Sequence, residues 1–159
     1  FSQSRPAMKK IYINGFRGLG TRDADYSLEN ALIFTGHVGI AFEGDSNIIY
    51  GFHPTDAEIE RIGSIKQAIA KLKAHKVGDT LAGILYDDHA HFVRATVLAE
   101  QRNDSNDRNT TVFQYFIEKE DAEFERIRRL VLEWYKKKSS LMVFRLSHSH
   151  PTEITVVLL

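Results

Sequence analysis

Hydrophobic and polar positions alternate most regularly over residues 35–54. The hydrophobic positions in the first half of this stretch are Val38, Ile40 and Phe42. Residues 44–47, Gly-Asp-Ser-Asn, then supply turn chemistry before an apolar run over residues 48–52. An alternating strand, a polar turn and a second apolar strand are the pattern of a β-hairpin. The sequence therefore predicts a hairpin here, with His37 where its first strand begins.

Further segments have strand character, because they are short and apolar or rich in β-branched and aromatic residues. These segments are residues 10–14, 80–86, 111–117 and 141–146. The segment 92–100 stays open between helix and strand, since its β-branched residues favour a strand and its last three residues, Leu-Ala-Glu, do not. The glycine-rich residues 15–20 are predicted as a loop, and residues 27–32 as a short turn or helix.

Two regions have helical spacing. Between Glu120 and Lys138 the apolar residues fall on one face, with acids early and lysines at the end, where they suit the helix dipole. This pattern predicts an amphipathic helix packed on the sheet. The second region runs from Thr55, which opens a capping box with Glu58, to about residue 75. Gly63 costs a helix about 1 kcal/mol, so one or two short helices are expected there.

These elements predict an α+β fold with a mainly antiparallel sheet and packed helices. The chain has 159 residues, which suits one ordinary hydrophobic core and therefore a single domain over residues 8–159. Residues 1–7 are polar and aperiodic and precede Met8, so we interpret them as a remnant placed ahead of a natural initiator methionine.

Composition narrows the classes of partner. Lys+Arg and Asp+Glu are both 21, so the basic surplus that phosphate binding requires is missing and no nucleic-acid partner is expected. No apolar run is long enough to span a bilayer and no signal segment is recognisable, which predicts a soluble chain that is cytoplasmic or exported by a route that needs no such signal. The sequence has no cysteine, so disulfides, thiolate metal sites and a thiol nucleophile are excluded for the chain as given.

Two histidine clusters offer candidate metal ligands. They are Asp87-Asp88-His89-Ala90-His91 and His148-Ser149-His150, and on a strand an H-x-H pair would point both rings to one face. Neither spacing recurs elsewhere in the chain, so the sequence predicts no functional metal. The glycines of residues 15–20 match neither a P-loop nor a dinucleotide fingerprint, and no cofactor is expected.

The hairpin headed by His37, its exit Tyr50-Gly51-Phe52-His53-Pro54 and the later helix and strand together resemble a known family. The chain is similar to the circularly permuted papain-like amidases of the NlpC type, whose relatives include the lecithin:retinol acyltransferases. In that family a strand beginning His-x-Gly-Ile carries the general base, a second strand carries a polar residue that orients it, and a cysteine nucleophile follows, commonly as Asn-Cys. The resemblance covers residues 35–146 in order of elements. Its residue-level match is confined to the hairpin.

This resemblance implies a permuted papain-like fold in which His37 is the base. Strand alternation places the orienting residue near the end of the hairpin, where His53 and Tyr50 have suitable hydrogen-bonding atoms. We favour His53 and leave Tyr50 open. His37 is expected to line a groove with a polar atom of one of them near its ring.

The absent cysteine has three explanations: replacement of the nucleophile, a natural pseudoenzyme, or a sequence that departs from its ancestral reading before the nucleophile. Residues 153–159 can be back-translated so that the neighbouring frame reads Asn-Asn-Cys-Cys-Thr-Phe, which favours an altered or truncated C-terminal segment. The expected function is a papain-like thiol hydrolase of amide or acyl bonds, in an inactive form. Its substrate would be a peptide, peptidoglycan or a lipid-like molecule. The alternative is a non-catalytic module that binds a peptide or small ligand, and exposed apolar surface could support a homodimer.

Overall fold

The computed structural model describes residues 5–17, 36–74, 76–103, 112–146 and 154–158. Its strands form one seven-stranded sheet in the order β5-β1-β2-β3-β4-β6-β7, and every neighbouring pair is antiparallel. The strands are β1 (Met8–Arg17), β2 (Gly36–Phe42), β3 (Asp45–Pro54), β4 (Thr80–Asp87), β5 (Val112–Glu120), β6 (Ser140–Leu146) and β7 (Ile154–Leu158). The predicted α+β class with a mainly antiparallel sheet is confirmed, and each strand predicted after residue 35 is present.

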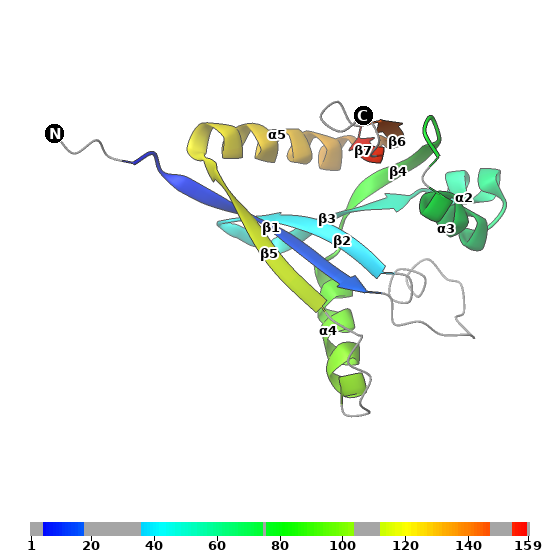
Figure 1. Cartoon of the computed structure of the whole chain (residues 1–159), viewed down its shortest axis with the longest axis horizontal. Coiled ribbons are helices and arrows are strands. Elements are labelled where there is room, and N and C mark those ends of the chain that lie inside the picture. Colours follow the sequence, from blue (N-terminus) through cyan, green and yellow to red (C-terminus); the bar gives the residue numbers. More distant parts are fainter. Residues whose placement is uncertain (1–4, 18–35, 75, 104–111, 147–153, 159) are drawn as a thin grey trace.

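The described helices lie on both faces of this sheet (Figure 1). They are α2 (Asp56–Ile62), α3 (Ile65–Ala74), α4 (His89–Asn103) and α5 (Asp121–Lys137). The helix α5 follows β5 directly and runs along one face, whereas α4 follows β4 and descends from the other. Among the described residues, none of the helices combines the length and apolar character that crossing a bilayer requires.

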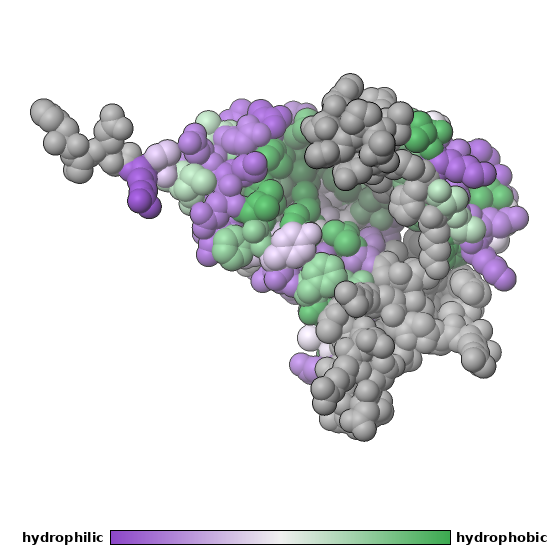
Figure 2. All heavy atoms as spheres, in the orientation of Figure 1, coloured by the Kyte–Doolittle hydropathy of each residue, from purple (hydrophilic) through white to green (hydrophobic). Residues whose placement is uncertain are grey.

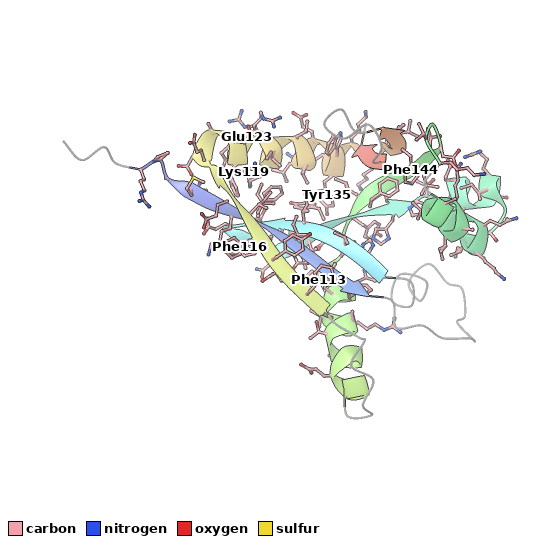
Figure 3. All side chains as sticks on the ribbon, in the orientation of Figure 1. Phe113, Phe116, Lys119, Glu123, Tyr135 and Phe144 are labelled. Carbon is pink, nitrogen blue, oxygen red and sulfur yellow. The ribbon has the colours of Figure 1, made fainter. Side chains whose placement is uncertain are left out.

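The face under α5 is an aromatic and aliphatic core. Phe124 and Val131 of α5 pack on inward-pointing residues of the central strands. The buried members are Ile11, Phe42, Tyr50, Leu85, Phe124 and Val131. Tyr135, on the sheet side of α5 (Figure 3), meets Tyr50 edge to face with ring centroids 5.3 Å apart. The predicted amphipathic helix therefore covers one face, as expected.

The opposite face carries a second, smaller cluster beneath α4. Its buried residues are Phe16, Ala41, Ile49, Phe92 and Ala95. Ile49 and Tyr50 are consecutive in β3 and lie in different clusters, as the alternation of a strand requires. The two faces of one sheet are thus both buried, by different helices.

Some local predictions were correct in detail. Thr55 caps α2, because its hydroxyl accepts from the Glu58 backbone N–H at 3.2 Å. Gly63 ends α2 at a positive φ of 122°, which separates α2 from α3. The two short helices expected from residue 55 are present.

Other local predictions were wrong or lie outside the described part of the chain. Residues 15–20 were predicted as a loop, but residues 15–17 continue β1, paired with β2 throughout and with β5 as far as Phe16. Pairing on both sides therefore outweighs the tendency of the glycines to form a loop, and residues 18–20 lie outside the described residues. The open segment 92–100 is helical, and His89 and His91 lie in that same helix, not on a strand. Residues 27–32 and 148–150 lie outside the described residues.

The edge strand β5 leaves much of its apolar surface exposed. Phe113, Tyr115, Phe116 and Ile117 are exposed, and the rings of Phe113 and Tyr115 stack at 6.1 Å. Figure 2 shows hydrophobic side chains gathered below α5 on this side, and Figure 3 labels Phe113 and Phe116 along the strand. β7 lies at the other edge of the sheet, where it pairs with β6.

Candidate functional site

Strand alternation brings two of the predicted site residues together on the α4 face. His37 lies near the start of β2 and His53 near the end of β3. Their ring centroids are 5.2 Å apart at an angle of 60°. His53 shares a face of the sheet with Gly51, since residues two apart in a strand point to the same side. His37 lies on that side too, because a Cβ at Gly51 would meet its Nε2. The hairpin therefore places two imidazoles side by side.

A buried carboxylate joins these two imidazoles. Asp88 has no exposed surface, and its Oδ2 lies 2.5 Å from His37 Nε2. Its Oδ1 lies 2.5 Å from His53 Nε2. Each carboxylate oxygen thus accepts one hydrogen bond from an imidazole, which satisfies the two polar groups that burial would otherwise penalise.

The backbone holds Asp88 where β4 passes into α4. Its N–H donates to the Ile49 carbonyl at 2.7 Å, which anchors it to β3. Its carbonyl accepts from the Phe92 N–H at 3.1 Å, the first turn of α4. Because a central strand and a helix both fix this backbone, the carboxylate has a defined position between the rings.

The electrostatics favour an ionised carboxylate. Burial alone would raise the pKa of Asp88, but hydrogen bonds from His37 and His53 outweigh burial and hold the pKa below its usual value. An ionised carboxylate only accepts hydrogen bonds, so both imidazoles donate through Nε2–H. In a neutral His37 the basic lone pair is then on Nδ1.

Gly51 makes room for this arrangement. A Cβ at this position would overlap Asp88 Oδ2 and would lie 2.5 Å from His37 Nε2. The carboxylate therefore lies directly over the backbone of β3, which a larger residue would prevent. The glycine in Tyr50-Gly51-Phe52-His53 is a requirement of the site and not only of the strand.

Aromatic rings and one more histidine surround the cluster. The Phe16 and Phe92 rings lie 6.2 and 6.1 Å from the His37 ring. His91, in the first turn of α4, places Nδ1 3.4 Å from Asp88 Oδ1. That contact lacks hydrogen-bond geometry, so the buried Nδ1 has no hydrogen-bond partner. Among the described residues, His37, His53 and Asp88 are also the group whose donor atoms converge closely enough to hold a metal ion.

The sequence-predicted residues divide between the two faces. His37 and His53 meet at the cluster, although Asp88 bridges them where a direct contact was expected. Tyr50 lies on the α5 face, where its hydroxyl is buried without a hydrogen-bond partner and burial raises its pKa. Tyr50 therefore does not contact His37. From the sequence, Asp88 was a candidate only as a metal ligand and not as a partner of the histidines. Its position directly after the apolar strand β4 is the sequence feature that points to a role in the site.

A groove lies on the same face, next to α4. Its larger part has a volume of about 440 Å³ and adjoins a part of about 290 Å³. Four residues line both parts: Asn14, Ile49, His89 and Gln114. Phe92 lines the groove and also contacts the His37 ring, so the groove ends one aromatic ring away from the cluster. His37 itself lines neither part of this groove, contrary to the prediction.

Comparisons with protein-family models, curated proteins and solved structures give no match to this chain.

Proposed function

We propose that the chain carries the base-bearing part of a papain-like thiol hydrolase site, in a form without the thiol. The observation that supports this most is the 2.5 Å hydrogen bond between His37 Nε2 and the buried Asp88 carboxylate. A histidine that takes a proton from a nucleophile needs a partner that fixes its tautomer and stabilises the resulting imidazolium. Asp88 has the charge and the position for both tasks.

In this proposal each residue has a separate role. His37 is the general base, and Nδ1 is the ring nitrogen that would accept the thiol proton, because Nε2–H is donated to Asp88. His53 is a positioning residue, since it holds the other carboxylate oxygen at 2.5 Å. The bond to be cleaved would be an amide or acyl bond, in a peptide, peptidoglycan or lipid-like substrate. The sequence has no cysteine, so this chain itself forms no thioester.

A thiol-bearing form tests this proposal. The coding DNA after codon 146 should be sequenced, and the neighbouring frame that reads Asn-Asn-Cys-Cys-Thr-Phe should be expressed in place of residues 153–159. We expect a thiol-directed probe to label this protein at neutral pH, and His37→Ala to slow labelling by about 100-fold. The control is Glu100→Ala, because Glu100 is exposed on α4 and lines neither part of the groove. A folded protein whose labelling is the same with and without His37 would refute the base role.

A non-catalytic binding module is the second candidate, supported by the groove next to α4. Its walls combine apolar side chains with the amides of Asn14 and Gln114, which hydrogen-bond each other at 2.7 Å. Such a mixture is typical of sites that hold a small ligand or a peptide. If the thiol-bearing form is unreactive while a peptide or small-molecule library yields a ligand that shifts the groove resonances in NMR spectra, this second function is favoured.

A further inference from the structure

The cluster on the α4 face has a second chemistry, which goes beyond the proposed hydrolase ancestry and concerns the chain as it stands. We propose that His37, His53 and Asp88, with His91 as the fourth ligand, form a site for a divalent transition-metal ion, for which Zn²⁺ is the best match. The donor atoms of the first three residues all lie within 4.8 Å of one another. They come from two strands and a strand-helix junction, so the fold and not a local motif assembles them.

The donor set selects the kind of metal. Two imidazoles and one carboxylate are ligands that Zn²⁺ accepts readily, at about 2.0–2.2 Å. Mg²⁺ and Ca²⁺ prefer oxygen ligands throughout, and the sequence offers no thiolate for softer ions. Tetrahedral bond lengths of that size separate neighbouring ligand atoms by about 3.3 Å. Each imidazole nitrogen lies 2.5 Å from its own carboxylate oxygen, so each of these two contacts has to lengthen by about 0.8 Å to reach that separation.

His91 is the independent observation that points to a ligand. Its Nδ1 is buried and has no hydrogen-bond partner, although it lies 3.4 Å from Asp88 Oδ1. A buried nitrogen without a partner is unfavourable, and coordination to a metal beside Asp88 would satisfy it. The spacing of three residues along α4 puts Asp88 and His91 on the same side of the helix start.

Burial and rigidity suit a bound ion. The side chains of His37, His53 and Asp88 are 9%, 6% and 0% exposed, so water competes little for the ligands. The His91 side chain is 20% exposed, and it connects the cluster to solvent. Metal sites are strongest where rigid elements fix the ligands, and here the backbone of Asp88 is bonded to β3 and to α4.

Metal binding and base catalysis exclude each other at His37. A neutral imidazole that coordinates through Nε2 carries its proton on Nδ1, so it has no lone pair left for a thiol proton. In a thiol-bearing form, Zn²⁺ would therefore inhibit the proposed base. In the present chain the metal would replace the hydrogen bonds that now join the two rings to Asp88.

Metal titration of the chelator-treated full chain tests this proposal. We expect one Zn²⁺ per chain with a dissociation constant on the order of 1 μM or tighter, measured by calorimetry. Co²⁺ should give the visible absorption of a tetrahedral site and be displaced by Zn²⁺. His53→Ala should weaken binding by at least about 100-fold and His91→Ala by about 10–100-fold. Glu100→Ala, which removes an exposed carboxylate from the same helix, should leave the affinity within about twofold.

The variants also show whether the metal ion binds at this cluster or elsewhere in the chain. Circular dichroism should be used to check that each variant is folded. If His53→Ala does not fold, His91→Ala provides the test of the site, because His91 is only partly buried. A folded wild type without saturable binding overturns the proposal. Wild-type affinity in both variants also overturns it, since the ion would then bind elsewhere, for example at His148-Ser149-His150. The chain has no cysteine, so the outcome is independent of the hydrolase proposal.

Discussion

The two faces of the hairpin formed by β2 and β3 are built from the same strands and yet have opposite chemistry. On the α5 face, Phe42 and Tyr50 pack against Phe124 in an almost wholly apolar core. On the α4 face, His37 and His53 form a buried polar network with Asp88. Successive side chains of a strand point to opposite faces of the sheet. The same short stretch of sequence therefore supplies residues to the apolar core on one face and to the polar cluster on the other.

The faces also differ in how they satisfy polar atoms. The Tyr50 hydroxyl is buried on the apolar face without a partner. On the other face both oxygens of Asp88 are hydrogen-bonded, and the atom of the cluster left without a partner is His91 Nδ1. Contacts between apolar side chains are not directional, so small shifts of the side chains cost little. The stability of a buried charge, by contrast, depends on every hydrogen-bond partner that it has. We therefore expect the α5 face to dominate stability and the α4 face to depend most on single polar atoms.

The largest effect is expected from the apolar face. Phe42 is fully buried, and Phe42→Ala should lower the free energy of unfolding by about 3–5 kcal/mol in urea denaturation. Val38→Ala, on the same strand but 55% exposed, should change it by less than about 0.5 kcal/mol. Equal effects of the two changes would show that the packing of the α5 face has been misassigned.

On the polar face, a change that replaces a single atom should lower the free energy of unfolding by nearly as much. Asp88→Asn replaces an oxygen that accepts from an imidazole with an amide nitrogen, so one of the two rings loses its charged acceptor. We expect a loss of about 2–3 kcal/mol in the same measurement. Asp56→Asn is the control, because Asp56 is an exposed carboxylate in the first turn of α2. A loss at Asp88 no larger than at Asp56 would mean that the network is not stabilising.

The pH dependence of stability should follow the same carboxylate. The pKa of Asp88 lies below its unfolded value, so the ionised form stabilises the folded state at pH values above the unfolded pKa. That contribution should be lost as the pH falls below about 4 and through the lower folded pKa. Thermal melts of chelator-treated protein from pH 7 to pH 2 should show this loss. Asp88→Asn should show a shallower dependence, and parallel curves would contradict the assignment.

Gly51→Ala tests the close approach of carboxylate and backbone. The new Cβ overlaps Asp88 Oδ2, so we expect a loss of about 1–3 kcal/mol and displacement of the carboxylate. In an Asp88→Ala background the same change should cost at least about 0.5 kcal/mol less, because the obstructing group is gone. A double-mutant cycle by chemical denaturation measures this coupling. Strict additivity would place the strain elsewhere in β3.

The smallest effect is expected at Tyr50. Its hydroxyl has no hydrogen-bond partner, so Tyr50→Phe should change the free energy of unfolding by less than about 1 kcal/mol, with either no change or a gain in stability. Tyr86→Phe, at an exposed ring, is the matched control. A loss above 1.5 kcal/mol, which lies beyond the value of a typical neutral hydrogen bond, would reveal a hydrogen-bond partner for the hydroxyl. The α5 face would then also depend on a buried polar contact, as the α4 face does.

The local pattern of apolar and polar residues predicted much of this fold. Alternation over residues 35–54 predicted the hairpin, and the spacing of apolar residues between Glu120 and Lys138 predicted α5, because both periods are properties of the backbone itself. The segment 92–100 was not decided by pattern. Its β-branched residues suit either state, and it is a helix whose Phe92 and Ala95 pack beneath the sheet.

The sequence by itself determined the hairpin with its two faces, the helix α5, the short helices after Thr55 and the presence of two histidines on one face of the hairpin. Only the tertiary structure decided what those histidines contact. Asp88 lies 51 residues from His37 and 35 from His53 along the chain, and it reaches them because β4 pairs with β3 and turns into α4 beside them. A local pattern holds no information on such pairings, since strand order and the direction of a following helix are fixed by the packing of the whole domain.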